Sequence, residues 1–255
     1  MSWYSLLFAV LCVVVFLLFR GEEGLSRRAP EVVAKNDMSS SPARSAVVIF
    51  LHGLGDTGAG WSALPGSFRG RAGASSWRFT MPTAPQRAVT CNGGARTHAW
   101  MDLEEIPVLP DGADDAAGFT ASAKIIHALI DAEVAKGTAV RDVFLGGFSQ
   151  GAAMSLWAGL SYPKGPLGGV IGMSGWWPAT MSLPNPPREG ERVLLCHGRS
   201  DGVVVYACRD AAAEKLKARG GIAIETQSFS GGHEFHNDEP AWLHAFIMAR
   251  LNQTD

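Results

Sequence analysis

A pentapeptide of the form G-x-S-x-G, Gly147 to Gly151, most constrains what this chain can fold into. A short apolar run typical of a strand precedes it at 143–145, and small and apolar residues at helical spacing follow it at 152–157. A strand, a sharp turn and a helix form the context in which this pattern is a nucleophile elbow, with its serine on a strained turn. The sequence therefore predicts that Ser149 is a nucleophile. The alternative is a glycine-rich turn with an idle serine.

Strand-like and helix-like segments alternate from about residue 46 onward. Continuous apolar runs are typical of strands buried on both faces, and apolar residues three and four apart are typical of helices. We expect strands at 46–51, 77–80, 142–146, 168–173, 192–196 and 222–229, and helices at 120–136, directly after Ser149, at 206–219 and at 240–252. The alternation predicts an α/β fold, with one mainly parallel sheet covered by helices on both faces. We expect this catalytic domain to span 46–255.

The first twenty residues differ in kind from the rest. The run from Trp3 to Phe19 is uncharged, and its 17 residues lie at the lower limit for a helix that crosses a bilayer. We expect a transmembrane-type anchor at 1–20, with a cleaved signal peptide as the alternative. Residues 21–45 are polar, contain Pro and Ser, and predict a flexible linker.

Basic residues follow this run and none precedes it. By the positive-inside rule, a single-pass anchor then leaves the catalytic domain facing the cytosol. Cleavage of the segment would instead make the protein secreted or luminal.

The overall composition limits the classes of partner and cofactor that we expect. The net charge is −2, from 22 basic and 24 acidic residues, so nothing favours nucleic acid. The four cysteines are few for a disulfide scaffold and have no metal-binding spacing. We expect no metal and no cofactor, and the sequence indicates no oligomeric state.

An elbow serine needs an acid and a histidine from later strand ends, in that order along the chain. Asp201 follows the expected strand 192–196, and His233 lies in a Gly-rich loop after strand 222–229. Alone, each would be read as a turn or surface residue. Both, however, occur in the required order at the edge where open α/β sheets bind ligands. The predicted catalytic residues are Ser149, Asp201 and His233.

These residue types predict acyl transfer. His233 would take the proton of the Ser149 hydroxyl, and Asp201 would hold the imidazole in the right tautomer. The oxyanion that then develops needs two backbone N–H donors. One is expected from Gln150, directly after the nucleophile, and the other from Leu54, in the loop after strand 46–51.

Seven short motifs also occur in one order: His52-Gly53-Leu54-Gly55-Asp56, Pro82-Thr83-Ala84-Pro85, Trp100-Met101-Asp102, Gly146-Gly147-Phe148-Ser149-Gln150-Gly151, Ser174-Gly175-Trp176, Cys196-His197-Gly198 and Gly232-His233. In combination they resemble the acyl-protein thioesterase and carboxylesterase family of α/β-hydrolases, from about residue 46 to 250. The resemblance implies an α/β-hydrolase fold. It also implies serine hydrolysis of thioesters on S-acylated (palmitoylated) proteins, of lysophospholipids and of small carboxylic esters.

The resemblance further implies an apolar channel for the acyl chain, which the loop 104–119 would supply. The substrate-binding candidates are Trp100, Ile106, Val108 and Leu109. Simple packing of this apolar loop is the alternative. Two positions depart from the family pattern: Gly202 stands where a proline usually follows the acid, and Met101 where a second aromatic residue is more common.

Three functions follow from these patterns. The first is hydrolysis of fatty-acyl thioesters on S-acylated proteins through an acyl-enzyme, with residues 3–19 holding the protein at a membrane. The second is a lysophospholipase or general carboxylesterase that uses the same triad, since specificity lies in loop shape. The third is a catalytically inert, membrane-tethered binding module.

Overall fold

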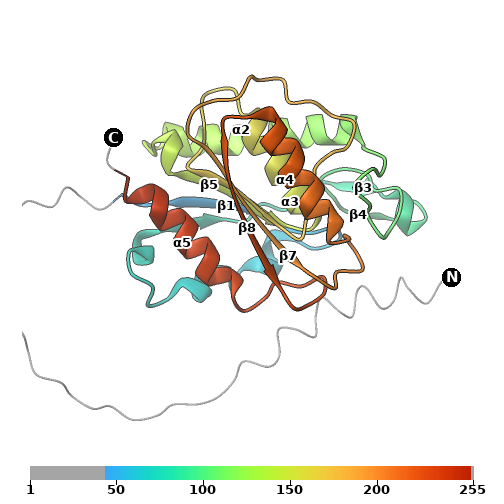
Figure 1. Ribbon diagram of the computed structural model, residues 1–255, viewed down its shortest axis with the longest axis horizontal. Helices are drawn as coiled ribbons and strands as arrows, with labels where there is room; N and C mark the ends of the chain where they lie inside the picture. Colours follow the sequence, from blue (N-terminus) through green and yellow to red (C-terminus); the bar gives the residue numbers. More distant parts are fainter. Residues whose placement is uncertain (1–43, 254–255) are drawn as a thin grey trace, which may run out of the picture. The chain divides into compact units, whose positions relative to one another are not determined.

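Six parallel strands form the central sheet of the computed structural model, which describes residues 44–253 (Figure 1). They lie in the order β2-β1-β5-β6-β7-β8, and every neighbouring pair is parallel. The strands are β1 Val47–Leu51, β2 Arg78–Thr80, β5 Val143–Phe148, β6 Gly169–Met173, β7 Glu191–Gly198 and β8 Ile222–Phe229. The strand order runs outward in both directions from the β1–β5 pair. This pair is therefore the switch point at which open α/β sheets bind ligands.

Helices cover both faces of this sheet, as the sequence predicts. They are α2 Ala116–Ala135, α3 Gln150–Ser161, α4 Ala207–Arg219 and α5 Glu239–Leu251. Figure 1 shows α2, α3 and α4 on one face and α5 on the other. The expected α/β-hydrolase fold is confirmed in this arrangement.

The residues of β1 show why its sequence is continuously apolar. Val47 and Ile49 belong to the core between the sheet and α2, α3 and α4, whereas Val48 and Phe50 belong to the core beneath α5. Successive side chains of a strand point to opposite faces, so a strand covered on both faces needs apolar residues at every position. All five residues of β1 are buried.

Two local features differ from the expectation. Helix α2 begins at Ala116 rather than residue 120, because Asp115 caps it by accepting a hydrogen bond of 2.8 Å from the N–H of Gly118. A small antiparallel pair, β3 Gln86–Ala88 and β4 Arg96–His98, lies outside the main sheet. Its strands are three residues long and largely polar, so no apolar alternation marks them in the sequence.

The localisation expected from the sequence, a single-pass protein with its catalytic domain facing the cytosol, is wrong. Across residues 44–253 no helix combines the length and the apolar character that crossing a bilayer requires. The expected span at 3–19, and with it the segment 1–20 and nearly all of the linker 21–45, lies outside the described residues.

Candidate active site

Three polar side chains meet at the carboxyl edge of the sheet. Ser149 directly follows β5, Asp201 follows β7, and His233 lies in the loop after β8. Nε2 of His233 lies 2.8 Å from Oγ of Ser149, and Nδ1 lies 2.7 Å from Oδ2 of Asp201. A carboxylate only accepts hydrogen bonds, so Nδ1 carries the proton and Nε2 is left to accept the proton of the serine.

The backbone at Ser149 is strained, with φ 55° and ψ −121°. The flanking glycines explain how the chain reaches this turn. A Cβ at Gly151 would lie 2.1 Å from the carbonyl oxygen of Leu51, and a Cβ at Gly147 would lie 2.8 Å from the same oxygen. Strand β1 therefore approaches the elbow so closely that only glycine fits on either side of the serine.

Asp201 is buried among donors. Its Oδ1 accepts hydrogen bonds of 2.9 Å from the N–H groups of both Val203 and Val204. Burial acts to raise the pKa of Asp201, but hydrogen bonds from His197 and His233 outweigh burial and hold this pKa well below its usual range. The carboxylate is therefore ionised at neutral pH and can stabilise an imidazolium beside it.

The two backbone amides expected to bind the oxyanion have no hydrogen-bond partner in the part of the chain that the structure describes. Neither the N–H of Leu54 nor that of Gln150 donates a hydrogen bond to a group within residues 44–253. The loop after β1 lies against the elbow, since a Cβ at Gly53 would be 3.3 Å from the Cβ of Ser149. Two free donors beside the serine are what an oxyanion hole requires.

His52 braces the loop that carries Leu54. Its ring is fully buried; Nε2 accepts a hydrogen bond of 2.9 Å from the N–H of Ala84, so Nδ1 is the donor to the Gly53 carbonyl at 2.7 Å. Burial lowers the pKa of His52. The ring is therefore neutral at physiological pH, and both of its nitrogens serve to hold the loop.

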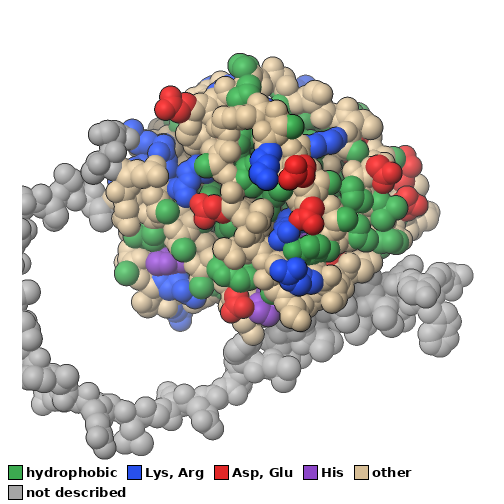
Figure 2. All heavy atoms as spheres, in the orientation of Figure 1, with side chains coloured by type: hydrophobic (Ala, Val, Ile, Leu, Met, Phe, Trp, Pro, Cys, Tyr) green, Lys and Arg blue, Asp and Glu red, His purple; other side chains and the backbone are tan. Residues whose placement is uncertain are grey.

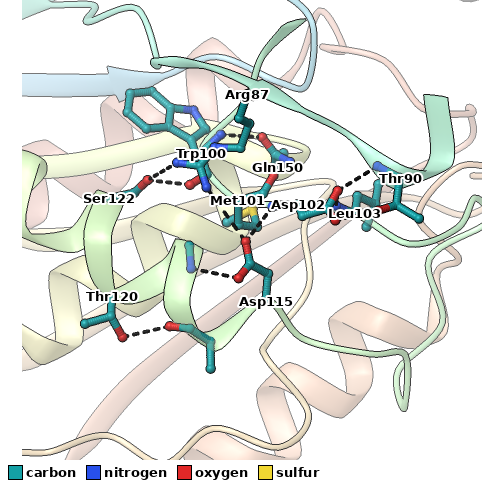
Figure 3. Close-up of polar contacts among 12 residues, drawn as sticks. Arg87, Thr90, Trp100, Met101, Asp102, Leu103, Asp115, Thr120, Ser122 and Gln150 are labelled. Atoms are coloured by element: carbon teal, nitrogen blue, oxygen red, sulfur yellow. Dashed lines mark hydrogen bonds and ion pairs between the residues drawn. The ribbon is translucent and has the colours of Figure 1, made fainter. Parts of the chain in front are cut away.

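The side chain of Gln150 extends into a buried polar network (Figure 3). Its Oε1 accepts a hydrogen bond of 2.7 Å from the N–H of Trp100, and its Nε2 donates one of 2.9 Å to the carbonyl of Met101. The carbonyl of Trp100 in turn accepts from Ser122 on α2. The start of α3 is thus tied to the segment after β4.

Trp100 has a different position from the one expected. It is fully buried, and its Nε1 donates a hydrogen bond of 2.9 Å to the carbonyl of His52. A side chain without exposed surface cannot contact a substrate. The expectation that Trp100 binds substrate is therefore wrong. Trp100 instead supports the loop of Leu54 from beneath.

The other substrate-binding candidates divide into two kinds. Ile106 and Leu109 are 39% and 42% exposed, whereas Val108 is buried at 6%. Val108 pairs with the loop of the acid: its N–H donates to the Val203 carbonyl at 2.8 Å, and its carbonyl accepts from Val205 at 3.2 Å. Val108 therefore anchors the loop 104–119, and Ile106 and Leu109 remain available on its surface.

A polar hollow of about 520 Å³ adjoins this loop. It is lined by Arg87, Ala88, Asp102, Glu104, Ala113, Asp114 and Asp115, and by none of the three residues at the sheet edge. Figure 2 shows acidic and apolar side chains gathered on the side where Figure 1 places β3 and β4. The hollow is therefore not the apolar channel that the resemblance implies.

Three supporting roles were missed by sequence reasoning: those of His52, His197 and the Gln150 side chain. Each residue lies within a motif that the family resemblance singles out. The motifs mark the positions but not the bonds. His52 binds Ala84 and the Gln150 side chain binds Trp100 and Met101 far along the chain, and the contacts of His197 with Asp201 and Val204 depend on how the loop after β7 folds.

Comparison with known proteins places the chain among hydrolases. Residues 31–251 match the model of a family described as phospholipase/carboxylesterase. The carboxylesterase SOBER1 of Arabidopsis thaliana is 36% identical over 80% of this chain and 90% of the relative. The acyl-protein thioesterase 1 of Yarrowia lipolytica is 38% identical over 79% of this chain and 92% of the relative.

Solved structures agree with these sequence relatives. A crystal structure of Arabidopsis thaliana SOBER1 superposes with a TM-score of 0.75 at 32% identity, over 82% of this chain and 100% of that one. The crystal structure of Zea mays acyl-protein thioesterase 2 gives a TM-score of 0.68 at 30% identity, over 83% and 96% of the two chains.

Proposed function

The chain belongs to the phospholipase/carboxylesterase family and is a serine hydrolase of esters and thioesters, and on that premise we propose that it removes fatty-acyl groups from S-acylated proteins. Relatives named acyl-protein thioesterase 1 support this substrate class, including one from Gibberella zeae that is 35% identical over 81% of this chain. One observation carries the proposed mechanism: the continuous hydrogen-bonded line from Ser149 through His233 to Asp201.

In the first half-reaction, Oγ of Ser149 attacks the thioester carbonyl carbon while Nε2 of His233 takes the hydroxyl proton. The carbonyl oxygen becomes an oxyanion, and the N–H groups of Leu54 and Gln150 donate to it. When the tetrahedral intermediate collapses, the C–S bond breaks. His233 returns the proton to the departing thiolate, and the acyl group stays on Ser149 as an ester.

The second half-reaction repeats these roles with water. His233 takes a proton from water as the hydroxide attacks the acyl-enzyme carbonyl, and the same two amides hold the oxyanion. The bond to Oγ breaks, His233 returns the proton to Ser149, and the fatty acid leaves. Asp201 stays ionised throughout and stabilises the imidazolium at each stage.

Replacing the nucleophile tests this assignment. Ser149→Ala is expected to lower kcat on a palmitoyl-thioester peptide by on the order of 10⁴- to 10⁶-fold and to abolish labelling by a fluorophosphonate probe. Ser155→Ala is the matched control, because Ser155 is a buried serine of α3 whose hydroxyl has no partner among the described residues. Activity that survives in Ser149→Ala, with the control unchanged, would refute the proposal.

A second candidate function is hydrolysis of carboxylic esters, lysophospholipids among them. This function is favoured by the name of the Arabidopsis thaliana relative, a carboxylesterase, and by the description of the family as phospholipase/carboxylesterase. Ser149, Asp201 and His233 would catalyse this reaction too. Parallel kinetics on a palmitoyl-thioester peptide, a lysophospholipid and a short-chain ester would separate the two functions. A kcat/KM at least tenfold higher on either ester than on the thioester would favour this second candidate.

The third alternative, an inert binding module, predicts that the folded wild-type protein is not labelled by the fluorophosphonate probe. The short Ser149 to His233 distance argues against it, because an idle serine needs no general base within hydrogen-bonding reach.

A further inference from the structure

A second histidine touches the carboxylate of Asp201. Nε2 of His197, on β7, lies 3.2 Å from Oδ2 of Asp201 and 2.8 Å from the carbonyl oxygen of Val204. Both neighbours are acceptors, so Nε2 must carry a proton and shares it between them. The same Oδ2 atom accepts from His233. Two histidines therefore contact the acid of the proposed triad, and only one of them, His233, takes part in the proposed reaction.

These contacts close a ring around the carboxylate. The N–H of Val204 donates to Oδ1 of Asp201, and the carbonyl of the same Val204 accepts from His197, which also reaches Oδ2. A carboxyl group held at both oxygens through the N–H and the carbonyl of one residue has little freedom to rotate. Its Oδ2 is thereby kept in line with Nδ1 of His233, where small misalignments are costly.

His197 is itself firmly placed. Its side chain is 1% exposed, and its backbone pairs with Ser228 of β8, the strand that leads into the loop of His233. The ring of Tyr206 packs edge-on against it at 5.9 Å between centroids. Nδ1 has no hydrogen-bond partner among the described residues. Within residues 44–253, the polar contacts of the ring are those of Nε2 with Asp201 and Val204.

We propose that His197 is a positioning residue for catalysis, which fixes the orientation of the Asp201 carboxylate toward His233. The inference rests on the proposed function, because it assigns His197 a role only if Asp201 and His233 act on Ser149. His197 touches neither the substrate nor the serine. Its loss should therefore lower kcat and leave KM within about twofold, since positioning of the acid acts on the transition state.

Three variants separate positioning from packing. A glutamine side chain reaches the place of Nε2 with an N–H donor, whereas an asparagine side chain has the same amide one methylene too short, and leucine has no donor. We expect His197→Gln to retain kcat within about threefold. His197→Asn and His197→Leu should lose kcat on the order of 10- to 100-fold, as when a buried partner that orients a functional group is removed. This loss is smaller than the roughly 10⁴-fold expected when the acid itself is changed.

A spectroscopic readout accompanies the kinetics. The proton shared by Nδ1 of His233 and Asp201 should give a low-field resonance in the proton NMR spectrum of the wild type and of His197→Gln. The resonance should move upfield or broaden in His197→Asn and His197→Leu. If leucine prevents folding, the matched glutamine and asparagine pair still decides the question.

Two results would overturn the inference: wild-type kcat in a folded His197→Asn variant, or equal losses in His197→Gln and His197→Asn with an unmoved resonance. Ser149→Ala run in parallel distinguishes this failure from failure of the proposed function. If Ser149→Ala is inactive while all His197 variants are fully active, only the positioning role is wrong.

Discussion

The backbone N–H of Trp100 donates a hydrogen bond of 2.7 Å to Oε1 of Gln150, the residue directly after the proposed nucleophile. Trp100 also donates from its indole to the carbonyl of His52 in the loop after β1. One buried tryptophan therefore joins the two backbone segments whose amides are expected to bind the oxyanion. Because an oxyanion hole works through fixed donors, this link is a structural basis for pre-organisation.

Removing the Gln150 side chain should affect stability and activity together. Gln150→Ala leaves the N–H of Trp100 and the carbonyl of Met101 without partners in a buried site. Each such group costs about 1–3 kcal/mol, so we expect the free energy of unfolding in urea to fall by about 2–4 kcal/mol. We also expect kcat to fall with it. Gln86→Ala, at an exposed position of β3, serves as control, and a Gln150→Ala protein as stable as this control contradicts the network.

The elbow should not tolerate a methyl group. In Gly151→Ala the new Cβ would lie 2.1 Å from the carbonyl oxygen of Leu51, a contact that only movement of β1 can relieve. We expect a loss of about 3 kcal/mol or more, or failure to fold, measured by thermal and urea unfolding. Gly66→Ala is the comparison, since nothing lies within 4 Å of its added Cβ. Equal melting temperatures for the two variants would show that the close approach of β1 is not real.

The free energy of unfolding should fall as pH rises, because the buried carboxyl group of Glu239 loses its proton. This carboxyl group is fully buried at the start of α5, and burial raises its pKa to about 8 from an ordinary value of 4.5. The folded state thus keeps a proton that the unfolded state has released, so stability is full below pH 4.5 and is lost as pH rises to about 8. The loss is on the order of a few kcal/mol, because each unit of pKa shift corresponds to about 1.4 kcal/mol.

Urea unfolding at pH 5 and pH 9 checks this assignment. Glu239→Gln should flatten the difference between the two pH values, whereas Glu214→Gln, at an exposed site on α4, should keep it. An unchanged pH dependence in Glu239→Gln would place its origin in other groups.

Acyl-chain recognition should depend on the exposed apolar residues of the loop 104–119. Ile106→Ser and Leu109→Ser remove apolar surface that a long acyl chain would cover, so kcat/KM on a palmitoyl thioester should fall about 5- to 30-fold. An acetyl ester, too short to reach that surface, should be hydrolysed as by the wild type. Ile125→Ser is the matched control, because Ile125 on α2 is 42% exposed. Equal losses on long and short substrates would argue for simple packing instead.

Local sequence determined most of the fold and the chemical groups of the site. The apolar runs of β1, β5 and β7 identified buried parallel strands, because a strand covered on both faces has apolar residues at each position. The glycines around Ser149 identified the elbow, because its backbone is strained and crowded by β1. The order of Ser149, Asp201 and His233 followed from the strand ends of such a sheet.

Tertiary structure alone decided how those groups are held. His52 binds Ala84, Gln150 binds Trp100, and Val108 pairs with Val203, across gaps of 32, 50 and 95 residues. No periodicity or turn signal reports such contacts, since hydrophobic patterns record which face is buried and not which polar atoms meet there. For the same reason Trp100 was expected to contact substrate, and instead it lies buried with its indole bonded to His52 in the loop after β1. The sequence alone specified the proposed catalytic residues, whereas their alignment depends on long-range hydrogen bonds that form only once the sheet is assembled.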